Sequence, residues 1–350
     1  MTAALEYLLG GVIVAVALAD IFSTILVPGP IGGELRVVLQ IRRLTLPLWR
    51  YAARRRTRGD DRPSNGFAPF TFVMTFTTWM LLLLVGFGLL MHAAQGSFAP
   101  RLHRVDDALW VAGSSLLTLG ISEYDASGVA RWMILAAALS GFSALTASIT
   151  FMLQIQSGLH QREPRVLTLV GIAGSPPSGV IILETAASLS DRTYLERFFL
   201  EWRDWAAATL HSHLSYPMLS YYRSSDAQND WLTALEAVLD AASLVMALTD
   251  DPSIGAATLM HRTGSRTAST MRAAFGLVEC AQTHGDDSLQ HVADRLIRAG
   301  YGRAAQGQRL QRMIELRSDY AGHLEALASH LGASRAALVP EHGGRSSSDH

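Results

Sequence analysis

Lysine is absent from this chain of 350 residues, and all 29 of its basic residues are arginines. Charged residues make up only 17% of the sequence, whereas 49% of the residues are hydrophobic, and the formal net charge is −1. With a net charge so close to zero, the chain lacks the strongly basic composition that is typical of a nucleic-acid-binding protein. The apolar residues gather in the first half, which indicates a membrane module joined to one soluble domain.

Cysteine occurs once, as Cys280, which excludes an intrachain disulfide and a zinc site built from cysteines. The sequence shows no pairing of nucleophile and base, no metal-ligand cluster and no phosphate-binding loop, so we expect neither an enzyme nor a resident cofactor. His211 and His213 are two residues apart, which points them to different sides of a helix and argues against a metal site. Repeated arginines are missing from every apolar run, which excludes an arginine-rich voltage sensor.

Three long apolar runs predict membrane-spanning helices at residues 7–27, 70–94 and 129–155. Each reaches the length of about 20 residues that an α-helix needs to cross a bilayer. The first run lacks a basic start and a cleavage site of small residues, which favours a retained span over a signal peptide. Asp20 lies well inside this run, and we expect it either to pair with a nearby arginine or hydroxyl group or to act in gating.

Arginine is distributed unequally between the two loops that join these spans. The first loop has nine arginines, whereas the second has two, Arg101 and Arg104. The positive-inside rule therefore predicts a multi-pass protein of the inner cell membrane, with its N-terminus outside and its C-terminal domain in the cytoplasm. Residues 31–66 mix apolar side chains with arginines, so we expect either a helix along the inner leaflet or a solvated basic loop.

Ahead of Thr118 the external loop predicts a short apolar helix, which Asp106 or Asp107 can cap at its start. This helix is too short to span a bilayer. It is followed by a small, mostly apolar stretch, Thr118-Leu119-Gly120-Ile121-Ser122, and then by Glu123. Irregular backbone is tolerated at membrane depth only where it is buried in protein or lines water. The pattern therefore predicts a re-entrant loop.

The residues from Thr71 to Ile155 resemble the potassium-channel pore family, whose filter reads T-V-G-Y-G. The resemblance implies an outer helix, a pore helix that contains Trp110, a filter of residues 118–122, and an inner helix. In that family the filters of four subunits surround a cation with backbone carbonyl oxygens. The resemblance therefore implies a homotetramer that conducts K⁺ or another monovalent cation.

Further positions carry this resemblance, and two depart from it. Ser114 stands where some members have a glutamate behind the filter, Glu123 where the family usually has an aspartate, and Gly141 near the hinge glycine of the inner helix. Ile121 replaces the family's tyrosine, and Ser122 replaces its second glycine. A residue other than glycine at positive φ costs about 1–2 kcal/mol. We therefore expect conduction of K⁺ or weakly selective conduction that includes Na⁺.

An alternative from another class is a non-conducting membrane receptor or scaffold that keeps the pore fold. The soluble half would then sense or bind a partner, and the reconstituted protein would pass no ions. Under either interpretation we expect the lipid bilayer and further copies of the chain as partners, together with a possible cytoplasmic ligand of unspecified chemistry.

The sequence thus predicts an all-α membrane protein in five parts. They are an extra N-terminal transmembrane helix (1–30), a basic cytoplasmic or interfacial segment (31–66), the pore module (67–157), a helical cytoplasmic domain (158–332) and a disordered tail (333–350). Apolar residues at three- and four-residue spacing predict soluble helices near 178–190, 191–214, 230–248, 267–283, 288–298 and 304–331. They follow a short connection over 156–160, and we expect this domain to stabilise or gate the tetramer.

Overall fold

The computed structural model describes residues 2–25, 67–121, 123–189, 191, 193–222, 229–280, 286–301, 307–336 and 338. The predictions for residues 31–66, for Ser122 and for residues 339–350 lie outside this part of the chain. The described residues are almost entirely helical, and their one pair of strands joins β1 (Phe98–Ala99) to β2 (Asp125–Ala126). They form two compact units, divided between residues 156 and 157.

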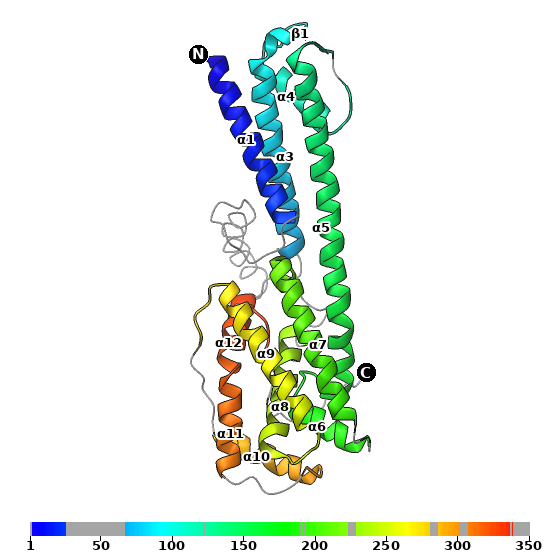
Figure 1. The fold of residues 1–350 in the computed structure, drawn as a ribbon, viewed down its shortest axis with the longest axis vertical. Coiled ribbons are helices and arrows are strands. Elements are labelled where there is room, and N and C mark those ends of the chain that lie inside the picture. Colours follow the sequence, from blue (N-terminus) through cyan, green and yellow to red (C-terminus); the bar gives the residue numbers. More distant parts are fainter. Residues whose placement is uncertain are drawn as a thin grey trace, which may run out of the picture. The chain divides into compact units, whose positions relative to one another are not determined.

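The first unit contains the three long apolar helices that the sequence predicts (Figure 1). They are α1 (Thr2–Ile25), α3 (Phe67–Ala93) and the first part of α5 (Val129–Ala173). The short helix α4 (Val105–Leu116) packs against α3, and η1 (Gln95–Ser97) follows α3. Along α5 the buried residues recur every three or four positions, as the 3.6-residue period requires: Ala137, Gly141, Ala144, Ser148 and Phe151.

Helix α1 is held against α3 by close backbone contact and by two polar pairs, Glu6 with His92 and Asp20 with Trp79. A Cβ at Gly86 would lie 2.7 Å from Val14 Cγ2 and 3.1 Å from the Gly10 carbonyl oxygen. Such small residues allow two apolar helices to approach closely. At one end Glu6 Oε2 lies 2.9 Å from His92 Nδ1.

Asp20 is buried and bonded within the first unit, while the arginine, hydroxyl and gating roles that the sequence suggested for it stay predictions. Trp79 Nε1 donates to Asp20 Oδ2 over 2.6 Å, and both side chains are at least nine-tenths buried. The indole is an N–H donor on an apolar ring, so it gives the carboxylate one hydrogen bond without adding a charge of its own.

The second unit is a helical bundle around α8 (Trp231–Leu248). Around it lie the end of α5, α6 (Gly179–Ser188), α7 (Tyr194–Ser215), η2 (Pro217–Tyr221), α9 (Ile254–Ala274), α10 (Asp286–Arg298), α11 (Gly307–Ser318) and α12 (Ala321–Leu331). Asp230 caps α8, because its Oδ1 accepts the backbone N–H groups of Leu232 and Thr233, each over 2.9 Å.

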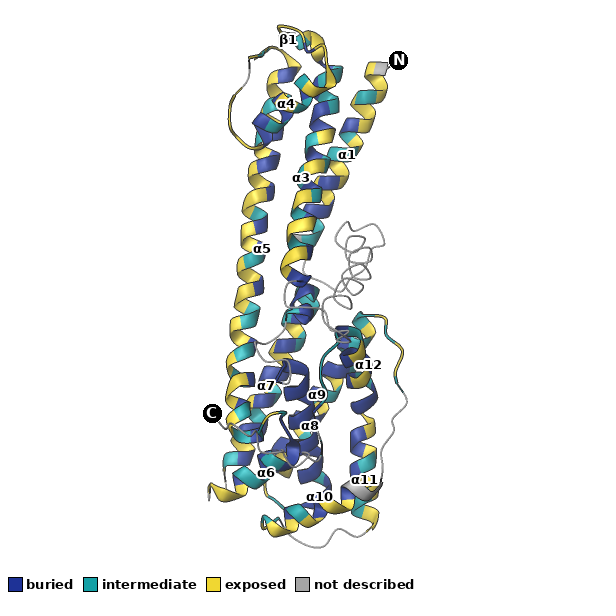
Figure 2. Ribbon diagram, turned by 180° about the vertical axis from the view of Figure 1, so that it is seen from behind, coloured by how far each residue is buried: buried dark blue, intermediate teal, exposed yellow. Residues whose placement is uncertain are grey.

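Four helices of the described residues are long and apolar enough to cross a membrane by length and composition: α1, α3, α5 and α8. They differ in how far the protein itself covers them (Figure 2). The most apolar windows of α1, α3 and α5 are 22%, 33% and 33% buried, whereas that of α8 is 94% buried. A helix that is apolar on all sides lies either in lipid or in a protein core. Because neighbouring helices cover α8, it lies in a protein core.

The soluble half departs from the sequence prediction in three places. Residues 156–160 are not a separate connection, because α5 continues through them to Ala173. Helix α9 begins at Ile254 instead of near residue 267, since its buried face consists of small and polar residues that give a weak apolar pattern. The predicted helix 304–331 is two helices, α11 and α12, separated at Asp319–Tyr320.

Residues 333–336, assigned by the sequence to a disordered tail, are ordered against the bundle. Gly332 ends α12 in the left-handed conformation, with φ of 66°, which only glycine adopts without a steric cost. Beyond it the chain has no helical or strand structure, and Ala336 is buried.

Candidate functional site

Helix α4 is the structural base of the candidate site. Its N-cap residue is Arg104, whose backbone N–H donates to Asp107 Oδ2 over 3.3 Å. The sequence predicted an aspartate as the cap, and Asp107 fulfils this role from inside the first turn. Asp106 and Asp107 also place negative charge at the positive end of the helix dipole. The buried face of α4 packs into the same core as Trp79 and Leu83 of α3.

Two glycines let the neighbouring helices approach α4 closely. A Cβ at Gly88 of α3 would come within 2.6 Å of Leu109 Cδ2. A Cβ at Gly141 of α5 would overlap the backbone carbonyl of Leu116, the last residue of α4. The backbone carbonyl cannot swing aside as a side chain can. Close approach to Leu116 is therefore sufficient reason for a glycine at position 141, and its role as a gating hinge stays a prediction.

The chain leaves α4 through a left-handed turn. The Thr118 N–H donates to the Ser115 carbonyl over 2.9 Å, and the Leu119 N–H donates to the Ser114 carbonyl over 2.8 Å. This pair of bonds closes a helix whose next residue has positive φ, and Thr118 has φ of 55°. Gly120 also has positive φ, at 68°. The Thr118 conformation costs about 1–2 kcal/mol, so the contacts around the turn must hold it in place.

Ser114 ties the far end of this turn back to α4. Its Oγ donates to the Ile121 carbonyl over 2.7 Å and accepts the Ile121 N–H over 2.9 Å. Ser114 is only 6% exposed, which strengthens both bonds by excluding water. The structure thus brings together Ser114 and Ile121, which the sequence assigned to the filter and its support.

The backbone carbonyls of the stretch fall into two groups. Within the described residues, the carbonyl oxygens of residues 118–120 accept no hydrogen bond, whereas that of Ile121 accepts one from Ser114. Residues 118–121 are all exposed, with Leu119 at 55% and Ile121 at 59%. Among the described residues, no donor therefore occupies these three carbonyls, whereas the fourth is engaged by Ser114.

Trp110 and Glu123 are not joined to this stretch. Trp110 is 57% exposed on α4, and Glu123 is exposed beyond it; neither makes a hydrogen bond to residues 118–121 within the described part of the chain. The return to α5 is held instead by the β1–β2 pair and by Ser127, whose backbone N–H donates to the Ser97 carbonyl over 2.8 Å. The sequence contained no specific signal for this pairing.

A separate polar centre lies in the second unit, around Arg162 of α5. This side chain is 2% exposed, and it donates to the Leu219 carbonyl over 3.2 Å and to the Tyr222 carbonyl over 2.8 Å. Its Nη1 also lies 3.2 Å from His213 Nε2, and its guanidinium 5.9 Å from the Trp231 ring centre. Arg162 thus joins the end of α5 to α7, η2 and α8, a role that the sequence analysis missed.

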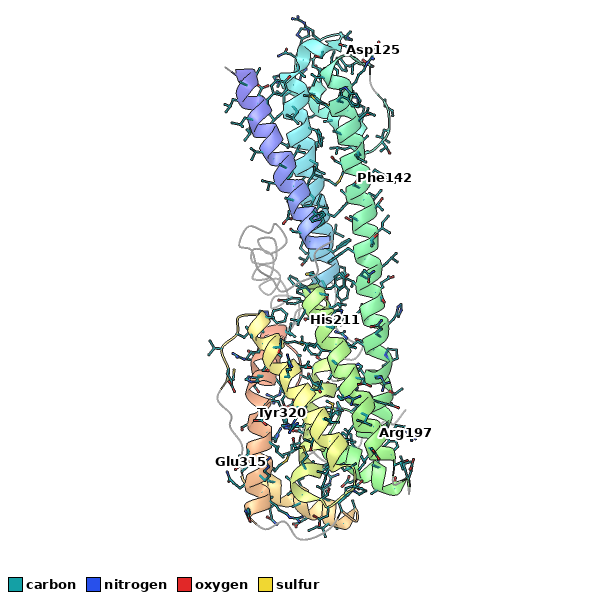
Figure 3. The ribbon with its side chains drawn as sticks, viewed as in Figure 1. Asp125, Phe142, Arg197, His211, Glu315 and Tyr320 are labelled. Carbon is teal, nitrogen blue, oxygen red and sulfur yellow. The ribbon has the colours of Figure 1, made fainter. Side chains whose placement is uncertain are left out.

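His213 is neutral in this centre. Burial, and then the Arg162 charge, lower the pKa of His213 to about 3, although the Thr209 carbonyl at 2.7 Å from Nδ1 works in the opposite direction. The neutral ring donates from Nδ1 and accepts at Nε2, which matches both neighbours. His211, two residues earlier, is exposed (Figure 3).

This pKa predicts a pH-dependent stability. An unfolded histidine has a pKa of about 6.5, so below that pH the unfolded chain binds a proton that folded His213 does not. His213 therefore lowers the free energy of unfolding as the pH falls from about 6.5 toward 3, by up to about 1.4 kcal/mol per pH unit. We expect His213→Gln to reduce this slope in denaturant unfolding of the whole chain between pH 7 and pH 4. His211→Gln is the control and should keep the slope; equal slopes in the two variants would contradict the assignment.

Among the described residues no group of three or more histidine, cysteine, aspartate or glutamate side chains is placed to hold a metal ion. In comparisons with known proteins, no family model, no curated protein and no solved structure matched the chain. The functional assignment therefore depends on the geometry of residues 114–121 and on the sequence pattern around them.

Proposed function

We propose that this protein is a tetrameric cation channel of the potassium-channel type, which conducts K⁺ or weakly selects among monovalent cations. The observation that carries the proposal is the row of three carbonyls at residues 118–120, which accept no hydrogen bond from the described residues and directly follow a short apolar helix. A cation that sheds its water needs such oxygens in exchange. The left-handed conformations of Thr118 and Gly120 fit a backbone that turns successive carbonyls.

In this proposal three helices cross the inner membrane: α1, α3 and the first part of α5, with the N-terminus outside. Helix α8 stays in the soluble unit because it carries two buried carboxylates, Glu236 and Asp240, and is covered by its neighbours. Charged side chains are expensive in lipid. The exposed apolar residues of α5, among them Leu135 and Leu139, are then available to lipid or to other copies of the chain. Phe142, which Figure 3 labels, is another of them.

The soluble unit would stabilise or gate the pore. Helix α5 continues without a break from the apolar run to Arg162, whose contacts anchor it to other helices of the second unit. A ligand that binds one arrangement of those helices more tightly than another would shift the equilibrium between the open and closed pore. The shift in free energy could not exceed the difference between its binding free energies for the two arrangements. The continuous helix supports this coupling.

Assembly is tested by crosslinking, which the single native cysteine makes simple. Four filters around one axis bring the four copies of position 118 close together. In a Cys280→Ser background, we expect Thr118→Cys to crosslink between subunits in membranes, whereas Thr168→Cys, at an exposed position near the end of α5, should not. A protein that stays monomeric, or crosslinks equally at both positions, would contradict the proposal.

A second candidate is a non-conducting receptor or scaffold with the same fold. It is favoured by the Ser114–Ile121 contact, because an Ile121 carbonyl that already accepts a hydrogen bond offers less to a passing cation. The two candidates differ in one observable, which is whether the reconstituted protein passes cations.

Ser114→Ala should have a large effect on any conduction. It removes both bonds that hold Ile121 against α4, each worth about 0.5–1.5 kcal/mol, and leaves the Ile121 carbonyl and N–H to bond with water. We expect the K⁺ flux, or the ratio of K⁺ to Na⁺ permeability, to change by at least about tenfold. Ser115→Ala is the matched control, since its hydroxyl bonds only to the Val111 carbonyl within α4. Equal behaviour of the two variants would show that Ser114 does not hold a functional filter.

A further inference from the structure

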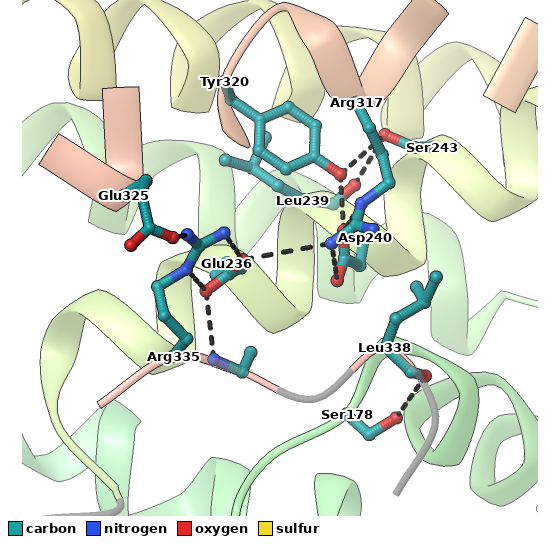
Figure 4. Close-up of polar contacts among 11 residues, drawn as sticks. Ser178, Glu236, Leu239, Asp240, Ser243, Arg317, Tyr320, Glu325, Arg335 and Leu338 are labelled. Atoms are coloured by element: carbon teal, nitrogen blue, oxygen red, sulfur yellow. Dashed lines mark hydrogen bonds and ion pairs between the residues drawn. The ribbon is translucent and has the colours of Figure 1, made fainter. Parts of the chain in front are cut away.

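The end of the described chain occupies a buried carboxylate site in the second unit (Figure 4). We call residues 333–336 and 338 the C-terminal strap. Arg335 Nε donates to Glu236 Oε2 over 2.7 Å, and its Nη2 donates to Glu236 Oε1, so the pair is bidentate. The Ala336 N–H donates to Glu236 Oε2 over 3.0 Å, and Ser178 Oγ donates to the Leu338 carbonyl over 3.2 Å. One side chain, one N–H and one carbonyl of the strap are thus recognised.

The charges around the site require a cation from the strap. Glu236 and Asp240 lie one turn apart on α8 and are 1% and 0% exposed. Arg317 bonds to Asp240, with Nε 2.9 Å from Oδ1, and its Nη2 lies 4.0 Å from Glu236. The Tyr320 hydroxyl also donates to Asp240 Oδ1, over 2.6 Å. Of the two buried carboxylates, Asp240 is paired with Arg317, and Glu236 is paired with Arg335, whose Nη1 also donates to the half-exposed Glu325.

The strap differs from an ordinary piece of the core. It follows the left-handed Gly332, has no helical or strand structure, and makes polar contacts through Arg335, whose side chain is 27% exposed. Buried ion pairs rarely add stability beyond what apolar residues would give, and their best-attested use is to specify one arrangement. A carboxylate such as Glu236 in the middle of a core helix is therefore best explained by selection of a particular segment.

We propose that the second unit contains a recognition site for an extended peptide segment with an arginine, and that the chain's own strap is its exchangeable occupant. Glu236 recognises the guanidinium group of an arginine, because its carboxylate accepts two parallel N–H bonds from that planar group. The ammonium group of a lysine cannot form this pair of bonds. Ser178 recognises the strap by donating to the backbone carbonyl of Leu338, three residues beyond Arg335. This proposal does not depend on ion conduction, since every contact lies within the second unit.

Peptide binding to the full-length protein tests this site. The probe is a fluorescent peptide with the sequence of residues 333–340, and the receptor is full-length Arg335→Gln, in which the strap has lost its anchor. We expect binding at least about tenfold tighter than for the same peptide with glutamine in place of arginine. The wild type, whose site is occupied, and Glu236→Gln/Arg335→Gln, whose site has lost its carboxylate, should both bind at least about tenfold more weakly. A folded Arg335→Gln protein that does not distinguish the two peptides would overturn the proposal.

A second experiment tests the proposal if the Arg335→Gln protein fails to fold. A protease site inserted after Gly332 in the wild-type chain is cut once the protein has folded, so that the strap is held only by its contacts. Exchange of the cut strap for the arginine peptide, but not for the glutamine peptide, supports the proposal. A cut strap that is never released, or a protein that unfolds when it leaves, would show that the strap is an integral part of the core.

Discussion

Gly141→Ala is expected to abolish cation flux and to destabilise the first unit. The added methyl group would overlap the Leu116 carbonyl at the end of α4, so α5 and α4 must move apart at the point where the chain enters residues 118–121. Forcing a methyl group into a packed interface costs typically about 1–3 kcal/mol, and a rigid backbone neighbour favours the upper end of this range. The measurements are the thermal unfolding midpoint in detergent and cation flux in liposomes.

Gly171→Ala is the matched control for this substitution. Gly171 lies in the same helix, and a Cβ there would meet nothing within 4 Å. Alanine in an exposed helical position is favourable over glycine by about 0.5–1 kcal/mol, so the control should be as stable as the wild type or slightly more so. If Gly141→Ala behaves like Gly171→Ala, the contact between α5 and Leu116 does not position the filter.

Asp240→Ala should be the most destabilising single substitution in the second unit. It removes the carboxylate that pairs with buried Arg317 and accepts the Tyr320 hydroxyl. Burial, and then the Asp240 charge, raise the pKa of Tyr320, so the phenol stays neutral and loses its acceptor in the variant. Breaking a buried ion pair from one side costs about 3–5 kcal/mol. Denaturant unfolding, followed by the fluorescence of Trp202, Trp205 and Trp231, measures the loss.

Glu315→Ala provides the comparison on the surface of the same bundle. Glu315 lies 3.0 Å from Arg312, and both side chains are more than half exposed. Exposed pairs of this kind contribute about 0–1 kcal/mol. A loss of stability in Asp240→Ala no larger than in Glu315→Ala would mean that Arg317 finds another partner and that the buried network is dispensable.

The sequence predicts the first unit well because the information there is local. Long apolar runs predicted the positions of α1, α3 and the start of α5, and the short apolar run after Asp106 and Asp107 predicted that a helix such as α4 exists, without giving its end. The contacts that join these helices are not local. Asp20 and Trp79 are 59 residues apart, and no pattern in either segment indicates that they meet.

Glycine shows how a local interpretation can fail. Gly158 lies in the polar stretch 156–160, which the sequence predicts to be a connection between two domains. In the structure it is helical, and a Cβ there would lie 2.8 Å from Leu219 Cδ1. The missing side chain serves close packing between α5 and η2. Gly141 follows the same physical rule, since its neighbour Leu116 comes from a different helix.

The carboxylates of α8 carried a signal that the sequence analysis did not use. Glu236 and Asp240 are four residues apart in an otherwise apolar run, which places both on one face of a helix that has no other charge. Buried charges need partners, so this spacing predicts arginines elsewhere in the chain. It does not predict which ones, because Arg317 and Arg335 lie 77 and 99 residues away.

Cation flux through purified wild-type protein in liposomes tests the central claim most directly. Vesicles loaded with K⁺ and diluted into a K⁺-free medium should lose K⁺ through the protein, and the rate should increase with the amount of protein reconstituted. Gly171→Ala should match the wild type and Gly141→Ala should be inactive, while a K⁺ ionophore added at the end confirms that the vesicles are sealed. Flux no greater than in protein-free vesicles, with folded protein present, would contradict the channel and favour the non-conducting receptor.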